Sequence, residues 1–161
     1  MPETTSLKPA ATDVRWLDDD QQQHWRAYML GTLALLEKLD RDLKPHDLSL
    51  SEYEVLVRLS ESPDHTIRMA DLASSTNQSR SRLTHTISRM ERAGLVERVA
   101  CDEDRRGVNA ELTEHGRAVL VEAAPAHVRS VREGLIDVID PEDFVAVGRA
   151  FARVRGSLTC E

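Results

Sequence analysis

Aromatic residues are scarce in this chain of 161 residues: two Trp, two Tyr and two Phe make up 4% of it. A chain of this length can still bury a core, and that core must therefore be built mostly from Leu, Val, Ile and Ala. The length fits one domain, alone or with a short appendage.

Cysteine and long apolar runs are scarce as well. Cys101 and Cys160 stand in different contexts without metal-ligand spacing, which excludes a disulfide framework and favours a reducing compartment. The first residues lack a basic region followed by an apolar run, so we predict no signal peptide. Charged residues interrupt every apolar stretch before the roughly 18 residues that a membrane span needs. These absences predict a soluble, cytoplasmic protein with no membrane partner.

Recognisable catalytic and metal-binding patterns are missing. The six histidines are never four residues apart, as they would be in a helical zinc pair, and no Cys–His cluster occurs. The chain has no glycine-rich phosphate loop, no nucleophile elbow and no paired carboxylates in an apolar setting. We therefore expect no catalytic residue, no metal and no cofactor, and we do not expect an enzyme.

Positive charge is scarce overall but concentrated in one stretch. The net charge is −7. Residues 66–110 hold eight basic against six acidic residues, whereas the rest of the chain holds 13 basic and 22 acidic residues. An acidic protein with one arginine-rich segment is a common arrangement for a DNA reader, because only the docked face must meet phosphate.

Apolar residues recur at steps of three and four from Asp18 to Leu43, which predicts an amphipathic helix of about 26 residues. Leu30 and Leu35 widen its apolar stripe beyond what one neighbour covers. Such a helix packs in the core of its own chain or forms a dimer interface, and the pattern alone leaves both open. Residues 1–17 precede it; the first dozen or so are polar and unpatterned, and we expect the whole segment to be flexible.

Cap and breaker residues divide the middle of the chain. Ser49 and Glu52 predict a capping box at the start of a second helix, which ends near residues 62–64. A short helix capped by Thr66 follows, and then a longer one that Gly94 terminates. Residues 95–99 and 108–112 are strand-like and enclose a polar loop, which predicts a hairpin.

Helical patterns return in the last third of the chain. Thr113 caps a helix to about Ile139 that Pro125 should kink, and Asp140 opens a final helix. This order predicts a mainly α fold with a small β-hairpin wing: a winged helix-turn-helix plus N- and C-terminal dimerisation helices. The predicted parts are a flexible segment (1–17), an N-terminal dimerisation helix (18–47), a DNA-binding domain (48–113) and C-terminal dimerisation helices (114–161).

The helix before the hairpin has a polar face without acidic residues, whereas an ordinary solvated helix face mixes both signs. Arg bonds bidentately to guanine edges, and hydroxyls suit phosphates and several bases. The polar residues of this face are Ser79, Arg80, Ser81, Arg82, Thr84, His85, Ser88 and Arg89. We predict that Arg80 or Arg82 reads bases and that Arg89 grips phosphate.

The hairpin tip places acidic residues beside Arg105 and Arg106, and Gly107 permits a tight return. The negative potential of a narrow minor groove attracts arginine, and a neighbouring carboxylate such as Asp104 can hold that arginine in position. Taken alone, the loop is equally compatible with a generic charged turn.

A family resemblance covers residues 72–120, which read LASSTNQSRSRLTHTISRMERAGLVERVACDEDRRGVNAELTEHGRAVL. This run resembles the signature of the MarR family of bacterial regulators. The shared pattern is a Leu-Ala helix, a Ser-Arg-Ser recognition helix, a Leu-x-x-x-Gly-Leu-Val-x-Arg exit, an Asp-x-x-Arg-type wing and Leu-Thr-x-x-Gly. Met90 stands where the family usually has Leu, and Asn77-Gln78 replaces its usual small apolar turn.

The resemblance implies a homodimer whose terminal helices interlock and whose winged lobes bind double-stranded DNA at a pseudo-palindromic operator. Family members act mostly as repressors, and many release DNA when a small phenolic compound binds between the dimerisation and DNA-binding parts. Carried over by position, the DNA-binding residues are Ser79, Arg80, Ser81, Arg82, Thr84, His85 and Arg89 on the recognition helix, and Asp104, Arg105 and Arg106 on the wing.

Four of the six aromatic residues precede the recognition helix. In a chain this poor in aromatics, their concentration in the first two helices could line an apolar pocket with polar tips. We therefore predict that Trp25, Tyr28 and Tyr53 bind a small phenolic effector; the alternative is that these rings fill a dimer core.

An alternative from another functional class is a protein-interaction adaptor whose winged helix no longer reads DNA. Such an adaptor should have lost Arg82, Arg89 or Arg106, and this chain keeps all three. The sequence therefore favours the DNA-binding regulator.

Overall fold

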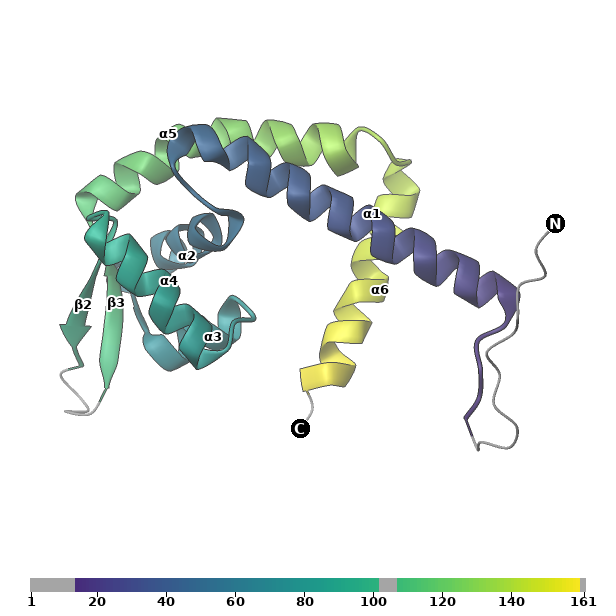
Figure 1. Ribbon diagram of the computed structural model, residues 1–161, viewed down its shortest axis with the longest axis horizontal. Coiled ribbons are helices and arrows are strands. Elements are labelled where there is room, and N and C mark those ends of the chain that lie inside the picture. Colours follow the sequence, from purple (N-terminus) through teal and green to yellow (C-terminus); the bar gives the residue numbers. More distant parts are fainter. Residues whose placement is uncertain (1–13, 102–106, 160–161) are drawn as a thin grey trace, which may run out of the picture. The chain divides into compact units, whose positions relative to one another are not determined.

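A computed structural model describes residues 14–101 and 107–159. It divides into two units, Met1–Leu33 and Ala34–Glu161, whose boundary falls inside the first helix. The elements are α1 (Asp19–Leu43), η1 (Lys44–His46), α2 (Leu50–Glu61), η2 (Pro63–His65), β1 (Thr66–Arg68), α3 (Met69–Ser75), α4 (Arg80–Arg92), β2 (Val96–Ala100), β3 (Val108–Leu112), α5 (Glu114–Val131), η3 (Arg132–Ile136) and α6 (Pro141–Thr159). Figure 1 labels α1 to α6, β2 and β3.

The first unit holds the beginning of α1. The Asp18 carboxylate accepts a hydrogen bond from the Gln21 backbone N–H at 2.8 Å, and the Gln21 side chain accepts one from the Asp18 N–H at 3.2 Å. This reciprocal cap fixes the start of the helix. The Trp25 and Tyr28 rings contact each other with centroids 5.7 Å apart. Leu30 is 69% exposed, so part of the apolar stripe faces outward in the single chain.

The predicted caps at Ser49 and Thr113 are confirmed, and the structure adds a cap at Ser79. Ser49 and Glu52 form the complete capping box of α2. The hydroxyls of Ser79 and Thr113 accept backbone hydrogen bonds at the starts of α4 and α5, at 3.2 and 2.9 Å. Gly94 follows α4 with φ +70°, a conformation that costs glycine little. These local signals set the ends of the helices around the hairpin.

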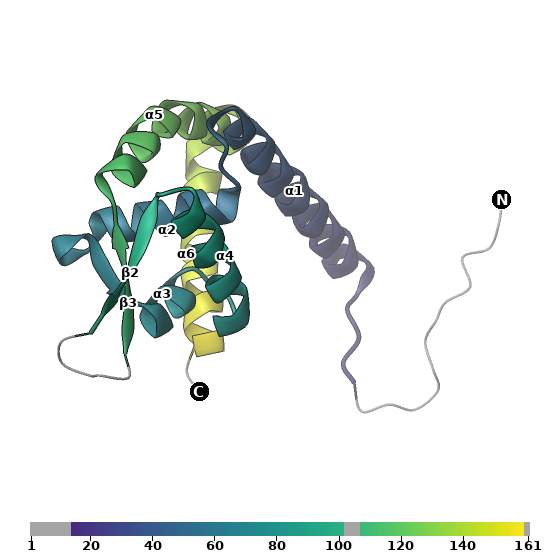
Figure 2. The same cartoon turned by 60° about the vertical axis from the view of Figure 1, so that its left-hand side comes forward.

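The sheet has three antiparallel strands in the order β1–β3–β2, and β2 runs beside β3 (Figure 2). The prediction that Thr66 caps the third helix is wrong: Thr66 begins β1 and pairs with Glu111, and α3 starts only at Met69. A strand of three residues has too little pattern to be recognised locally, and its partner lies about forty positions further along the chain. The fold class, a mainly α winged helix-turn-helix, is confirmed.

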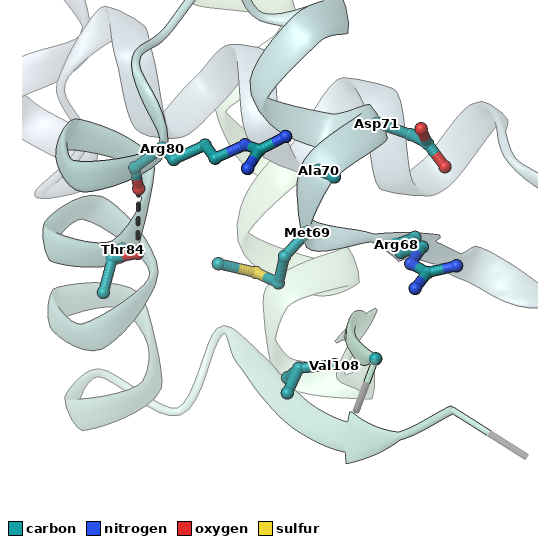
Figure 3. Close-up of a pocket in the computed structure, with 8 residues that line it drawn as sticks. Arg68, Met69, Ala70, Asp71, Arg80, Thr84 and Val108 are labelled. Atoms are coloured by element: carbon teal, nitrogen blue, oxygen red, sulfur yellow. Dashed lines mark hydrogen bonds between the residues drawn. The ribbon is translucent and has the colours of Figure 1, made fainter. Parts of the chain in front are cut away.

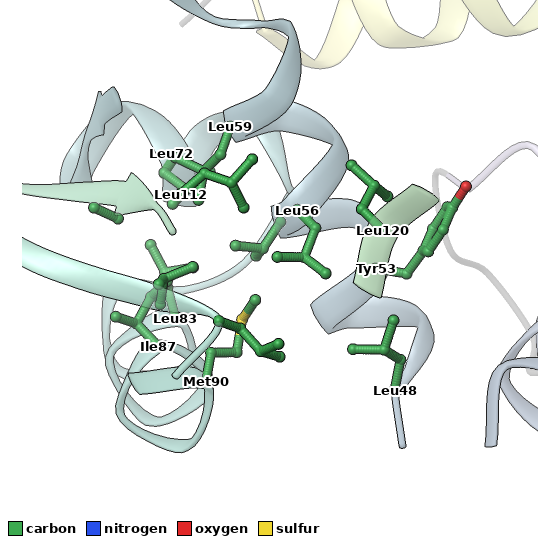
Figure 4. Packing of buried hydrophobic residues seen from close by; sticks show 14 of the residues in the cluster. Leu48, Tyr53, Leu56, Leu59, Leu72, Leu83, Ile87, Met90, Leu112 and Leu120 are labelled. Carbon is green, nitrogen blue, oxygen red and sulfur yellow. The ribbon is translucent and has the colours of Figure 1, made fainter. Parts of the chain in front are cut away.

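The core of the second unit joins α2, α3, α4, the sheet and α5 (Figure 4). It is built mostly from aliphatic side chains, as the scarcity of aromatics predicts, and Tyr53 is its aromatic member among the described residues. Its completely buried members are Leu43, Val55, Leu56, Leu59, Leu72, Leu83, Ile87, Met90, Ala110 and Ala123. Each large aliphatic side chain contributes about 1.5–3 kcal/mol by leaving water. The core therefore fixes the inner face of α4 and leaves its outer face free for function.

The C-terminal helices differ from the prediction in their bounds. Pro125 lies inside α5 without ending it. Helix α5 ends at Val131, earlier than the predicted end near Ile139, and the π-helical turn η3 follows it directly. Helix α6 begins at Pro141 as predicted, and each of its residues up to Leu158 is exposed in the single chain. None of the helices that the structure describes has the length and apolarity that crossing a membrane requires.

Candidate nucleic-acid interface

The buried residues of α4 determine which of its side chains face outward. Leu83, Ile87 and Met90 lie on one stripe, and all are completely buried. At about 100° per residue, the opposite stripe carries Ser81, His85, Ser88 and Arg92. One flank carries Arg80 and Thr84, and the other carries Arg82 and Arg89. All of these outer residues except Ser88 are exposed.

A cavity of about 590 Å³ lies between α4, the start of α3 and the start of β3 (Figure 3). Arg80 extends from α4 toward the start of α3, with Met69 and Val108 on other walls. The Thr84 hydroxyl donates to the Arg80 carbonyl at 2.8 Å. The complete lining is Arg68, Met69, Ala70, Asp71, Arg80, Thr84, Gly107 and Val108.

A second cavity of about 790 Å³ lies on the other flank of α4, against the start of α2. Its lining combines hydroxyls and cationic groups with a single carboxylate. The lining residues are Asp40, Ser49, Ser51, Ser79, Ser81, Arg82, His85, Thr86, Arg89 and Arg92. We call these two spaces the wing-side cavity and the α2-side cavity. Arginine and hydroxyl groups thus flank α4 on both sides.

Arg89 is held by the capping box of α2. Its Nε donates to the Glu52 carboxylate at 2.6 Å, and one terminal NH₂ group lies 3.4 Å from the Ser49 hydroxyl. The Glu52 side chain is only 8% exposed. Burial raises the pKa of Glu52, but hydrogen bonds from Ser49 and Arg89 outweigh it, so the pKa lies below its ordinary value. Glu52 therefore stays charged and partly neutralises Arg89.

The single acidic residue of α4 is neutralised in the same way. Glu91 forms an ion pair with Arg98 of β2, and its carboxylate also accepts a hydrogen bond from the Arg98 backbone N–H at 3.1 Å. Among the described residues, Arg80, Arg82 and Arg92 form no ion pair. The outer surface of α4 is thus left with three arginines whose charge no described carboxylate balances.

The structure brings seven of the predicted DNA-binding residues together on one helix and its cap. These are Ser79, Arg80, Ser81, Arg82, Thr84, His85 and Arg89. The wing residues Asp104, Arg105 and Arg106 lie outside the described residues, so their role stays a prediction.

Sequence reasoning missed Arg92, Ser49 and Ser51 as lining residues. Arg92 lies seven positions after His85 on the same helical stripe, so its spacing could have revealed it. The two serines belong to a different helix, and only the tertiary fold brings them to α4. The interface is therefore wider than the recognition helix alone.

The predicted effector residues fall in different places. Trp25 and Tyr28 lie in the first unit, whereas Tyr53 is buried in the second and stacks on His127 with ring centroids 4.3 Å apart. Burial raises the pKa of Tyr53 and lowers that of His127. A third, polar cavity of about 580 Å³ lies within the second unit, between the end of α1, α2 and the α3–α4 turn. It shares Asp40, Ser51 and Arg82 with the α2-side cavity, and its other lining residues include Leu36, Leu50, Glu54, Arg58 and Gln78.

Comparisons with known proteins agree with this geometry. The model of the MarR family matches residues 48–108. The crystal structure of AbsC, a MarR family transcriptional regulator from Streptomyces coelicolor, is 44% identical, with a TM-score of 0.87 over 92% of this chain and 100% of AbsC. Sco3205, a MarR family regulator from the same organism solved in complex with DNA, is 37% identical, with a TM-score of 0.88 over 92% of this chain and 94% of Sco3205.

Related proteins identified by sequence comparison are also transcriptional regulators. The transcriptional repressor MprA of Escherichia coli is 31% identical, but the match spans 56% of this chain and only 52% of MprA. The HTH-type transcriptional regulator YfiV of Bacillus subtilis is 30% identical over 81% of this chain and 80% of its own length.

Proposed function

This chain belongs to the MarR family of DNA-binding transcriptional regulators, and from that premise we propose that it represses genes by binding a pseudo-palindromic operator as a homodimer. We propose further that a small ligand releases it from DNA, and that it works in the cytoplasm, where a bacterial regulator meets its DNA. No step of this function needs a catalytic residue or a cofactor.

The observation that carries the proposal is the pair of cavities on the flanks of α4. The major groove of B-DNA is about 12 Å wide, close to the 10–12 Å diameter of a helix with its side chains. A helix in that groove therefore has a sugar-phosphate backbone on each side. The wing-side cavity lies on one flank of α4 and the α2-side cavity on the other, so each flank offers arginine and hydroxyl groups toward one backbone.

The outer stripe of α4 supplies the groups that would face base edges. Ser81 and His85 are small or planar polar side chains opposite the core, and Arg80 or Arg82 reaches inward from the flanks. Arg89 is predicted to grip phosphate, and its pairing with Glu52 orients the guanidinium while lowering its net charge. The predicted wing contacts by Asp104, Arg105 and Arg106 would extend the footprint into the minor groove.

The exposed apolar faces support a homodimer. Phe144, Val147 and Val154 of α6 are between 39% and 48% exposed in the single chain, and α1 carries a similar exposed stripe. Contiguous exposed apolar surface of this kind usually marks a protein interface. A two-fold dimer would present two α4 helices to half-sites about one helical turn apart.

A ligand response is supported by the polar cavity beside the end of α1 and by the aromatic residues of the first two helices. We propose that a small phenolic compound binds this chain, with Trp25, Tyr28 and Tyr53 as the predicted contacts. A ligand that binds the DNA-free form more tightly must weaken DNA binding, and tenfold release needs only about 1.4 kcal/mol of coupling. Tryptophan fluorescence during titration with salicylate and a phenolic panel, paired with gel shifts, tests this; no change in either signal at millimolar concentration would reject a phenolic effector.

The operator proposal is tested by selecting DNA from a random pool with the purified full-length protein and sequencing the bound fragments. The expected product is an inverted repeat, since a two-fold dimer reads the same half-site twice. A control selection with the Arg82→Ala variant should lose part of the consensus. Failure of the wild-type protein to enrich any sequence would contradict sequence reading and favour the protein-interaction adaptor.

A further inference from the structure

Arg98 on β2 makes four hydrogen bonds to the recognition helix. Its backbone N–H and its guanidinium both bind the Glu91 carboxylate. One terminal NH₂ group also donates to the Ser88 hydroxyl at 2.9 Å and to the Thr84 carbonyl at 3.1 Å. Arg98 is half-buried and lines neither the wing-side nor the α2-side cavity. Its donors are thus engaged with the protein, away from the DNA-facing spaces.

These bonds fix both the position of α4 along its axis and its rotation about that axis. Thr84, Ser88 and Glu91 come from successive turns, so one rigid guanidinium spans about two turns of the helix. Hydrogen bonds weaken steeply outside a narrow range of distance and angle. Sliding α4 along its axis, or rolling it about that axis, would therefore break several of these bonds together.

On the other flank of α4, a second ion pair joins the helix to α2, with the charges reversed. There the helix supplies the cation, Arg89, and α2 supplies the buried carboxylate, Glu52. Arg98 differs from Glu52 in its anchor, because β2 pairs directly with β3, and Arg98 lies opposite Ala110 in the middle of the β2–β3 ladder. The two strands that carry the wing loop are thereby joined to the recognition helix as one body.

We propose that Arg98 is a positioning residue for sequence readout: it touches neither base nor phosphate and instead holds α4 and the wing strands in one fixed relation. Base edges are read by directional bonds that require the reading side chains to be placed within about half an ångström, whereas phosphate attraction tolerates displacement. Loss of Arg98 should therefore reduce discrimination between operator and other DNA more than it reduces non-specific binding. The inference rests on the proposed DNA-reading function.

The test compares full-length wild type with Arg98→Gln, Arg98→Lys and Glu91→Gln, using a selected operator and a scrambled duplex of equal length. Arg98→Gln is expected to lower the operator-to-scrambled affinity ratio tenfold or more, with scrambled affinity changed less than twofold. Arg98→Lys keeps the charge but cannot span three partners, so the ratio should still fall. Glu91→Gln leaves the bonds from Arg98 to Ser88 and Thr84 in place, so the affinity ratio should fall less in this variant. Arg117→Gln, a matched loss of charge on the exposed face of α5, should leave the ratio unchanged.

The salt dependence separates positioning from phosphate contact. A phosphate contact contributes about one unit to the slope of log affinity against log salt concentration. The proposal is overturned if Arg98→Lys retains the wild-type ratio, or if Arg98→Gln lowers both affinities equally and loses a unit of slope. Thermal unfolding identifies variants that do not fold. If Arg98→Gln does not fold, Ser88→Ala takes its place, because it removes only one of the hydrogen bonds to Arg98. An unchanged operator-to-scrambled ratio in folded Ser88→Ala counts against the proposal. A wild type that prefers no sequence would instead refute the DNA-reading function itself.

Discussion

Helices α4 and α6 are both amphipathic, yet their apolar faces have different surroundings. In α4, Leu83, Ile87 and Met90 are completely buried by the rest of the same chain. In α6, Phe144, Val145, Val147 and Val154 are 39–59% exposed. The winged lobe, by which we mean α2 to β3, therefore completes its core within one chain. Helix α6 instead exposes apolar side chains that a second protein surface could cover. The difference separates the part that we propose to read DNA from the part that we expect to pair two copies.

The largest effect is expected inside the lobe. Leu56→Ala, in the middle of α2, should lower the free energy of unfolding by about 2–5 kcal/mol, because it removes buried methyl groups and leaves a cavity. Urea unfolding measures this, and Leu56→Met, which keeps the volume, should cost less than about 1.5 kcal/mol. A loss for Leu56→Ala no greater than for Leu56→Met would mean that the lobe core is not as closely packed as described.

The next effect concerns the exposed face of α6. Val147→Asp should weaken self-association about a hundredfold, or about 2.8 kcal/mol, because each dimer would bury two unpaired carboxylates. Sedimentation should then show a chain of 18.1 kDa at concentrations where the wild type is a dimer. Arg149→Asp is the control, since it lies off the apolar face; equal dissociation by both variants, or none by Val147→Asp, would contradict the assignment of this face.

In the recognition helix, Arg82→Ala is expected to weaken operator binding by about 1–3 kcal/mol and to relax the preference at one operator position. Arg89→Ala should instead weaken all sequences alike and reduce the salt slope by about one unit. Gel-shift titrations against single-position operator variants distinguish the two. Uniform losses for both variants would show that this helix does not read bases through Arg82.

The wing gives a comparable but more local prediction. Arg106→Ala should weaken operator binding by about 1–3 kcal/mol, and Arg105→Ala should have a smaller effect. The measurement is a gel-shift titration of both single variants. Unchanged affinity in both would remove the wing tip from the mechanism and leave α4 as the sole reader.

The smallest effect is a pH dependence of lobe stability. Burial lowers the pKa of His127 below 6.5, so the unfolded chain takes up a proton at higher pH than the folded one. The contribution of neutral His127 to the free energy of unfolding is therefore complete above pH 6.5 and is lost as the pH falls through the pKa of the folded state. His127→Phe keeps a ring against Tyr53 without titrating. Urea midpoints measured between pH 8 and 5 should therefore fall less in the variant, and equal slopes would contradict the assignment.

Much of the fold could be predicted because its signals are local. The capping box at Ser49, the cap at Thr113 and the glycine at position 94 each act within one helical turn. The heptad-like spacing of Leu83, Ile87 and Met90 identifies the buried face of α4 and, by elimination, the outer face that carries the candidate DNA contacts.

What escaped prediction depends on residues far apart in the sequence. Strand β1 exists because Ile67 pairs with Ala110. The Glu52–Arg89 ion pair joins residues 37 positions apart, so Arg89 read from sequence resembles an unpaired phosphate ligand. Gly116 is explained only by tertiary contact, since a Cβ there would lie 2.0 Å from the Leu95 carbonyl oxygen.

Hydroxyl-radical footprinting of a selected operator tests the central claim most directly, because it reports which sugars the protein covers. If α4 lies between two phosphate-binding flanks, each half-site should show protection on both strands across one major groove, and the two half-sites should lie about one helical turn apart. The Arg92→Ala variant should lose protection on one of the two backbones while keeping the other. Protection of a single strand, or of positions without two-fold symmetry, would contradict the account.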